Sequence, residues 1–250
     1  MVKYSVCLDA VFSGKDILDS INTCHACGMD VVEFWGFAEK DIDSIAALIQ
    51  KLDMKVSTFC APAIGLNDCS KHELFLEGLN EAIVAAKKLN VDRLITLVGQ
   101  DTGEKTEVQH ANIIEGLKKA LPILEANNMT IMIEPLNTIV DHAGYSLSYS
   151  SDAFNIVDKV ASEYVKVIFD IYHQQITEGN LISSITKNID KIAHFHTAGN
   201  PGRHELDMGE INYNEVIKAI DETSYTGCIG LEYFPVGNAE TSLKNLPFLK

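Results

Sequence analysis

The chain has 250 residues, of which 46% are hydrophobic and 22% charged, and its formal net charge is -15. This composition is that of a globular protein with enough apolar side chains for a large core, in one large domain or two small ones. The acidic balance and scattered basic residues exclude the usual nucleic-acid binders, and they argue against binding to anionic membranes.

The first residues lead directly into an apolar strand pattern, without the charged and long apolar regions of a secretion signal. No apolar run reaches about 18 residues, so we expect no membrane span. The six cysteines of a chain without an export signal are expected to be reduced, buried thiols. These features predict a cytoplasmic protein.

Short apolar runs alternate with amphipathic stretches along the whole chain. Strands are predicted at 4–8, 31–34, 56–59, 93–98, 130–133, 165–169, 192–195 and 228–231. Helices are predicted at 15–27, 41–52, 75–86, 108–124, 151–160, 181–188 and 214–220. Pro122 should kink its helix or mark the last turns, and Asn212, three residues before Glu215, should cap the final one.

These eight strand-helix units show no linker and no break in composition, so we predict one (β/α)8 barrel domain over residues 1–250. An open doubly wound sheet is the alternative fold. It usually carries a glycine-rich turn after the first strand, whereas this turn reads Asp9-Ala-Val-Phe-Ser-Gly14. The chain also has no phosphate-binding P-loop motif.

Four of the later strands each end in a residue that can bind a metal ion. These residues are Glu134, Asp170, His196 and Glu232. The carboxyl ends of barrel strands converge on one mouth, so the four side chains should meet there. Three carboxylates facing one another would repel, and a divalent cation would relieve that repulsion. The pattern therefore predicts a metal site at the barrel mouth.

Six segments in order resemble the hydroxypyruvate isomerase family, within the xylose isomerase-like TIM-barrel superfamily of sugar isomerases, sugar epimerases and type 2 abasic-site endonucleases. The segments are Gly28-Met-Asp-Val-Val-Glu33-Phe, Ile133-Glu134-Pro-Leu-Asn-Thr138, Phe169-Asp170-Ile-Tyr-His173-Gln-Gln175, Asn200-Pro-Gly-Arg203-His-Glu205, Gly209-Glu-Ile-Asn-Tyr213 and Gly230-Leu-Glu232-Tyr-Phe-Pro235. The resemblance covers essentially the whole chain.

The resemblance implies a Mg²⁺ or Mn²⁺ site at Glu134, Asp170, His196 and Glu232. The family tends to carry Gln where this chain has His196, and the imidazole favours softer ions such as Mn²⁺, Co²⁺ or Zn²⁺. It implies an isomerase that converts hydroxypyruvate to tartronate semialdehyde, or acts on a 2-oxo-tetronate, through a metal-bound enediolate. Glu134 and Glu232 are the hypothesised acid and base.

Four further residues are predicted to bind a small sugar or sugar-acid substrate. His173, in the loop after the sixth strand, would polarise its carbonyl or hydroxyl group. Arg203 would clamp a carboxylate, unless it pairs with Glu205 or Asp207 instead. Glu33 would hydrogen-bond to the substrate, and Trp35 would line the pocket. Gln100 and His142 are weaker candidates, and His194 is interpreted as a residue of the core.

Three other functions remain open at this point. A ketose 3-epimerase would use the same ligands and glutamates, and His196 favours it. An abasic-site endonuclease needs further histidines at strand ends, which the third and fourth strands do not supply. A non-catalytic sugar-binding barrel would be expected to have lost one of the two glutamates. The sequence leaves the oligomeric state open, including a homo-oligomer.

Overall fold

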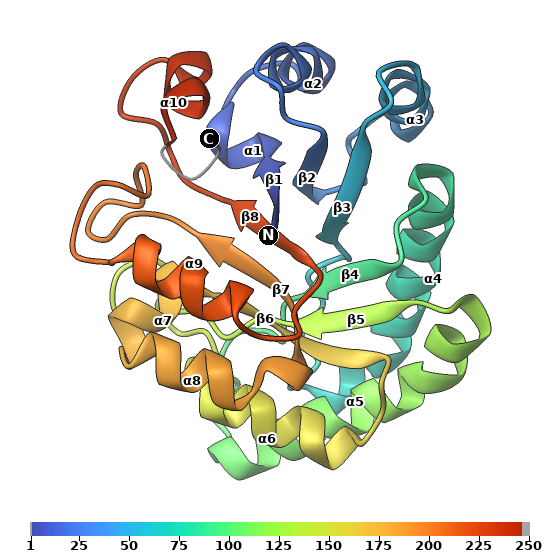
Figure 1. Cartoon of the computed structure of the whole chain (residues 1–250). Coiled ribbons are helices and arrows are strands. Elements are labelled where there is room, and N and C mark those ends of the chain that lie inside the picture. The colour runs from blue at the N-terminus through green and yellow to red at the C-terminus, as the bar shows by residue number, and fades with distance from the viewer. Residues whose placement is uncertain (1, 247–250) are drawn as a thin grey trace.

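The structure, a computed structural model, describes residues 2–246, so the first residue and the last four of the predicted domain lie outside the described residues. Eight parallel strands pair in chain order, and β8 pairs with β1 to close a barrel. The helices surround this barrel, as Figure 1 shows. The predicted (β/α)8 TIM-barrel fold is therefore confirmed.

The element bounds follow the predicted alternation. The strands are β1 (Lys3–Cys7), β2 (Val31–Gly36), β3 (Lys55–Cys60), β4 (Arg93–Thr96), β5 (Thr130–Ile133), β6 (Val165–Asp170), β7 (Ile192–Thr197) and β8 (Cys228–Leu231). The longer helices are α2 (Ile17–Ala26), α3 (Ile42–Lys51), α4 (His72–Leu89), α5 (Thr106–Asn127), α6 (Ser150–Val160) and α9 (Tyr213–Asp221). The shorter ones are α1 (Leu8–Val11), α7 (Ile171–Thr177), α8 (Leu181–Lys187), α10 (Ala239–Asn245) and the 3-10 turns η1 (Cys69–Lys71) and η2 (Ile189–Lys191).

Local hydrogen bonds decide where several helices begin. The predicted helix at 15–27 begins only at Ile17, because the Asp16 carboxylate caps it by accepting hydrogen bonds from the backbone N–H groups of Leu18 and Asp19. Asn212 caps α9 as predicted, and Pro122 lies inside α5 near its C-terminal end. The sequence did not predict α1, α7 and α10, which have 4, 7 and 7 residues. Such short helices show little of the 3.6-residue period, although α8, which also has 7 residues, was predicted at 181–188.

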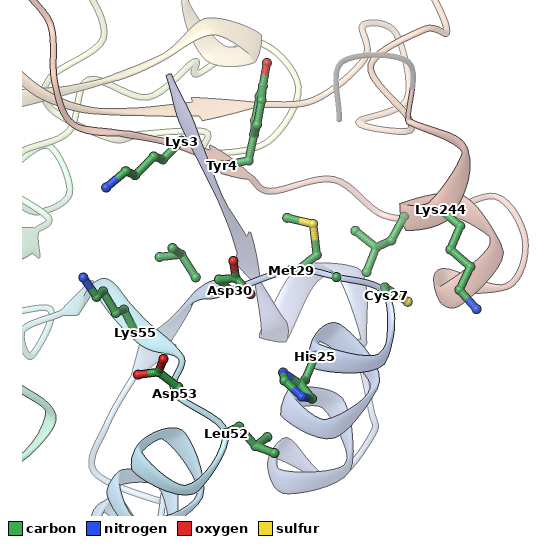
Figure 2. A pocket seen from close by; sticks show the side chains of 13 residues that line it. Lys3, Tyr4, His25, Cys27, Met29, Asp30, Leu52, Asp53, Lys55 and Lys244 are labelled. Carbon is green, nitrogen blue, oxygen red and sulfur yellow. The ribbon is translucent and has the colours of Figure 1, made fainter. Parts of the chain in front are cut away.

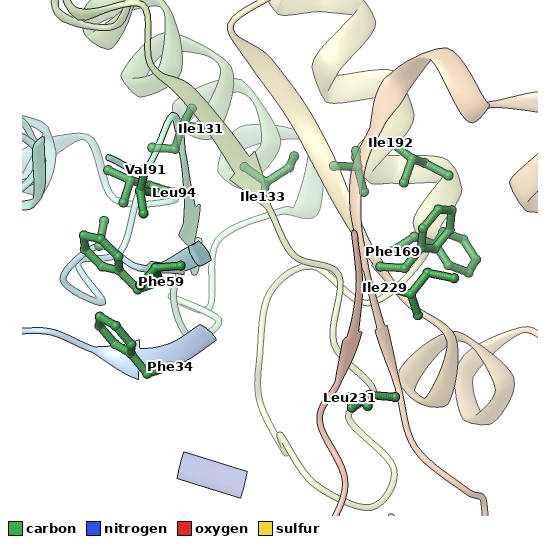
Figure 3. Close-up of a cluster of buried hydrophobic side chains, with 14 of the residues drawn as sticks. Phe34, Phe59, Val91, Leu94, Ile131, Ile133, Phe169, Ile192, Ile229 and Leu231 are labelled. Carbon is green, nitrogen blue, oxygen red and sulfur yellow. The ribbon is translucent and has the colours of Figure 1, made fainter. Parts of the chain in front are cut away.

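Side chains alternate between the two faces of each strand and form two apolar layers, one outside and one inside the barrel. One side of the strands, including Phe34, Phe59 and Phe169, packs against the helices in the main core, part of which Figure 3 shows. The opposite side of β4, β5 and β6 places Ile95, Met132 and Ile168 in a small cluster of their own. Side chains two residues further along this inner face point into the barrel mouth.

The six cysteines are all free thiols, and two of them, Cys7 and Cys24, are buried. Cys27, Cys60 and Cys228 are half-buried and Cys69 is exposed, so the expectation of buried thiols is met only by Cys7 and Cys24. Within residues 2–246, every helix is too short or too polar to cross a membrane.

Candidate active site

The four predicted ligands meet at the carboxyl end of the barrel. His196 Nδ1 lies 3.5 Å from Glu134 Oε1 and 3.4 Å from Glu232 Oε2. Glu134, Asp170 and His196 offer donor atoms that lie within 4.8 Å of one another. All four side chains are buried. Each lies two residues beyond an inward-facing position of its strand, so its side chain points to the same side, toward the barrel mouth. The sequence pattern and the closure of the barrel together produce this cluster.

Electrostatic interactions within this cluster shift the pKa values of its members. Burial acts to raise the pKa of Glu232, but His196 and Arg203 outweigh it and hold the pKa well below its ordinary value. Burial acts to lower the pKa of His196, yet the carboxylates of Glu232 and Glu33 raise it well above its ordinary value. Burial raises the pKa of Asp170, and Arg203 opposes that shift. The cluster therefore favours a positive partner.

The donor atoms of this cluster fit a divalent cation. His196 Nδ1 is buried and has no hydrogen-bond partner among the described residues, although two carboxylates face it. Asp170 Oδ1 accepts hydrogen bonds from the backbone N–H groups of Tyr172 and His173, which begins α7 and leaves Oδ2 available. Carboxylate oxygens with one imidazole nitrogen form a suitable donor set, so this is a candidate divalent-metal site.

Arg203 extends from the turn after β7 into the same cluster. Its Nη2 donates to Glu232 Oε2 and lies 3.7 Å from Asp170 Oδ2. It thus pairs with site carboxylates rather than with Glu205 or Asp207. The backbone at Arg203 is left-handed, with φ of 56°. The guanidinium also lies over the Tyr172 ring, 5.2 Å from its centroid. Its buried Nε has no hydrogen-bond partner among the described residues.

His173 lies in the first turn of α7 rather than in a loop as predicted, because Asp170 caps a helix immediately after β6. His173 Nδ1 lies 2.6 Å from the side-chain amide nitrogen of Asn137, whose oxygen accepts backbone N–H groups. This amide nitrogen must therefore donate to Nδ1, which leaves the ring proton on Nε2. Burial and Arg203 lower the pKa of His173 to about 3. Nε2 has no hydrogen-bond partner among the described residues and lies 3.5 Å from Asp170 Oδ2.

Trp35 and Glu33, both from β2, lie at different depths. Trp35 lines the pocket and is 38% exposed, and its Nε1 donates to Glu232 Oε1 at 2.5 Å. Glu33 is only 1% exposed and lies beneath His196, against His194. Burial acts to raise the pKa of Glu33, but His194 and His196 outweigh it and lower the pKa. Glu33 is therefore not a lining residue, and its position does not match the predicted substrate contact.

A pocket of about 430 Å³ opens above the cluster. Glu134, His173, His196, Arg203, Glu232 and Trp35 contribute to its wall. Apolar residues make up much of the rest, including Phe37, Pro62, Leu97 and Leu136. Cys60 and His142 also line it. His142, which follows β5, was predicted only as a weaker candidate, and Cys60 was not singled out although it ends β3, where mouth residues are expected.

A second hollow, of about 920 Å³, lies at the opposite end of the barrel. Figure 2 shows its lining, which comes from the amino-terminal ends of β1 to β3 and from the ends of α2 and α10. Its charged residues include Lys3, Lys55, Lys244, Asp30 and Asp53. The two groups of side chains in residues 2–246 that could hold an ion both include His196, which lies at the other end. The active site is therefore assigned to the smaller pocket.

Comparison with known proteins agrees with this geometry. A family model described as "Xylose isomerase-like TIM barrel" matches residues 21–250. A hydroxypyruvate isomerase of Escherichia coli (strain K12) is 31% identical to the chain over 253 residues, which cover 98% of each protein. The chain belongs to the hydroxypyruvate isomerase family. It is therefore an isomerase with the xylose isomerase-like fold.

Other members and neighbours of the hydroxypyruvate isomerase family match over nearly the full length. A 2-oxo-tetronate isomerase of Cupriavidus necator is 29% identical, with 97% of this chain and 96% of that protein covered. The crystal structure of an AP endonuclease, family 2, from Brucella melitensis has a TM-score of 0.93 and 27% identity, with 97% of each chain covered. Both relationships extend across the strand ends that carry the candidate ligands.

Proposed function

We propose that the chain isomerises a short 2-oxo acid with a neighbouring hydroxyl group, such as hydroxypyruvate or a 2-oxo-tetronate. The observation that carries this proposal is the meeting of Glu134 and Glu232 on one imidazole nitrogen, beside the half-buried guanidinium of Arg203. The two carboxylates can transfer protons, and the guanidinium in the same pocket can bind the carboxylate of the substrate. The names of the two full-length relatives support the same substrate class.

The reaction requires only proton movements within the substrate. Conversion of hydroxypyruvate to tartronate semialdehyde removes a proton from C3 and delivers one to C2, while the hydroxyl proton passes from O3 to O2. A base must therefore act at one carbon and an acid at its neighbour. Glu134 and Glu232 directly follow β5 and β8, and both face His196 Nδ1 and line the pocket. They exchange the roles of acid and base when the reaction reverses.

Mg²⁺ or Mn²⁺ is the proposed cofactor, with Co²⁺ or Zn²⁺ as alternatives that the imidazole of His196 favours. Glu134, Asp170, His196 and Glu232 would hold the ion. When bound, a divalent cation supplies Lewis-acid stabilisation of the negative charge that develops on the substrate oxygens.

Three residues would hold the substrate. Arg203 has its buried Nε free to donate to a substrate carboxylate, while Nη2 keeps Glu232 in place. His173 carries its proton on Nε2, in the pocket wall, where it can donate to the carbonyl oxygen. Trp35 holds the other oxygen of Glu232 and shields the site from water.

A ketose 3-epimerase is the second candidate, and the presence of His196 in place of glutamine favours it. The guanidinium of Arg203 argues against it, because a ketose offers hydroxyl oxygens but no carboxylate to pair with this charge. An abasic-site endonuclease is disfavoured by the net charge of -15, and β3 and β4 end in Cys60 and Thr96 rather than histidine.

Proton NMR in D₂O tests the proposal directly. Mg²⁺-loaded protein is mixed with hydroxypyruvate and, in separate tubes, with D-fructose and D-tagatose. We expect tartronate semialdehyde to form from hydroxypyruvate, and we expect a chelator to stop the reaction until Mg²⁺ or Mn²⁺ is added back. Deuterium at C3 of a ketose with accumulation of its epimer would replace the proposal by the epimerase function.

A further inference from the structure

Glu33 lies in a buried polar cluster beneath the candidate metal site. Its Oε2 accepts hydrogen bonds from the hydroxyl groups of Ser5 and Ser57 and lies 2.8 Å from His194 Nε2. A carboxylate oxygen can only accept, so His194 Nε2 must carry the proton. Three donors from β1, β3 and β7 thus fix the plane of this carboxylate.

The other carboxylate oxygen faces the candidate ligand His196. Glu33 Oε1 lies 2.8 Å from His196 Nε2 in an ion-pair contact, and neither atom has a conventional hydrogen-bond partner among the described residues. The remaining ring nitrogen, Nδ1, faces Glu134 and Glu232 on the other side. The imidazole therefore bridges the fixed carboxylate below and the candidate cation site above.

Gly230 in β8 makes room for this contact. A Cβ atom at this position would collide with Glu33 Oε1 and would lie 2.6 Å from His196 Cδ2. The absence of a side chain at Gly230 thus allows the carboxylate and the imidazole to approach each other. Ser5 and Glu33 lie on the adjacent strands β1 and β2, and β8, which carries Gly230, separates β1 from β7 with His196, so the approach depends on the register of the closed sheet.

We propose that Glu33 is a positioning residue, which holds the Nε2–H of His196 toward itself and so directs the Nδ1 lone pair into the cation site. This inference rests on the metal site of the proposed function. Contacts that orient a metal-binding histidine change metal affinity by about 10- to 100-fold when they are removed. Glu33 would therefore act on the metal through His196, without touching the substrate.

The test measures binding of Mn²⁺ by calorimetry to wild-type, Glu33→Gln and His194→Gln proteins. Glu33→Gln keeps the volume of the side chain but removes its charge and one acceptor. His194→Gln disturbs the same buried layer and removes one donor to Glu33, but the hydroxyl groups of Ser5 and Ser57 remain to hold the carboxylate beside His196. We expect Mn²⁺ affinity to fall about 10- to 100-fold in Glu33→Gln and less than about threefold in His194→Gln. Gly230→Ala should weaken binding in the same direction as Glu33→Gln.

Equal losses in the two glutamine variants would show a general packing role and overturn the proposal. Binding of two ions per wild-type chain would also overturn it, since Glu33, His194 and His196 are close enough to ligate an ion themselves. A second measurement does not depend on metal. In ¹⁵N-histidine-labelled protein without metal, we expect a slowly exchanging Nε2–H signal from His196 that disappears in Glu33→Gln.

The two measurements separate the two proposals. Failure of wild-type protein to bind Mn²⁺ would count against the metal-dependent function, whereas the His196 signal would still decide whether Glu33 holds the imidazole. A wild-type His196 without a proton on Nε2 would overturn the positioning role, whatever the metal affinity.

Discussion

The hollow at the amino-terminal end of the barrel has about twice the volume of the pocket at the carboxyl end, about 920 Å³ against about 430 Å³. Its charged side chains, such as Asp30, Asp53 and Lys55, are exposed. Those of the smaller pocket, including Glu134, Glu232 and His196, are buried and lie within a few ångströms of one another.

This comparison shows that volume is a poor guide to function in this barrel. Charges at the exposed end are screened by water and interact weakly. Buried charges are costly unless they are paired or bind an ion, so a cluster of them at the mouth indicates a site built for chemistry. The predictions below test whether function is confined to the mouth.

The largest effect is expected from the two glutamates at the mouth. Glu134→Gln or Glu232→Gln removes a group that exchanges protons, so the kcat for hydroxypyruvate should fall by about 10²- to 10⁴-fold. Steady-state kinetics checks this, with Glu73→Gln on the exposed surface of α4 as the matched control. Wild-type turnover in either mouth variant would remove the pair from the mechanism.

A smaller effect is expected when the carboxylate clamp is changed. Arg203→Lys keeps the positive charge but loses the Nε donor, and a hydrogen bond between charged groups contributes about 1.5–3 kcal/mol. The kcat/KM for hydroxypyruvate should therefore fall by about 10- to 100-fold, mainly through a higher KM. An unchanged KM would mean that Arg203 serves only to hold Glu232 and Asp170.

A modest effect is expected at the rim of the pocket. Trp35→Phe keeps an aromatic wall but removes the Nε1–H donor to Glu232 Oε1. Because Trp35 is 38% exposed, water can replace part of this interaction, and kcat should fall by only about three- to tenfold. Kinetics of Trp35→Phe that match the wild type would show that Glu232 needs no support from this side.

The smallest effect is expected at the opposite end. Lys55→Ala removes an exposed charge from the larger hollow, so the free energy of unfolding should change by less than about 0.5 kcal/mol and kcat should stay at the wild-type value. Urea unfolding and kinetics measure both quantities. Loss of activity would show that the amino-terminal end also contributes to function, and would contradict the conclusion that function is confined to the mouth.

The elements that form the mouth could be predicted from the sequence because their signals are local and periodic. Buried strands appear as continuous apolar runs, and a polar residue at the carboxyl end of such a run marks the mouth of a parallel barrel. Glu134, Asp170, His196 and Glu232 were predicted as ligands on this basis, and the structure brings them together. Short helices such as α7 escaped the analysis, which is why His173 was expected in a loop.

The sequence by itself thus determined the barrel, its order of strands and the polar residues at its mouth. Only the tertiary structure decided which side chains contact each other across the closed sheet. Glu33 and His194 lie 161 residues apart in the chain, and Arg203 had several carboxylates within reach. The register of the closed barrel brings Glu33 and His194 together, and the fold places Arg203 beside Glu232 and Asp170. Such choices depend on closure of the whole sheet, which no local pattern encodes.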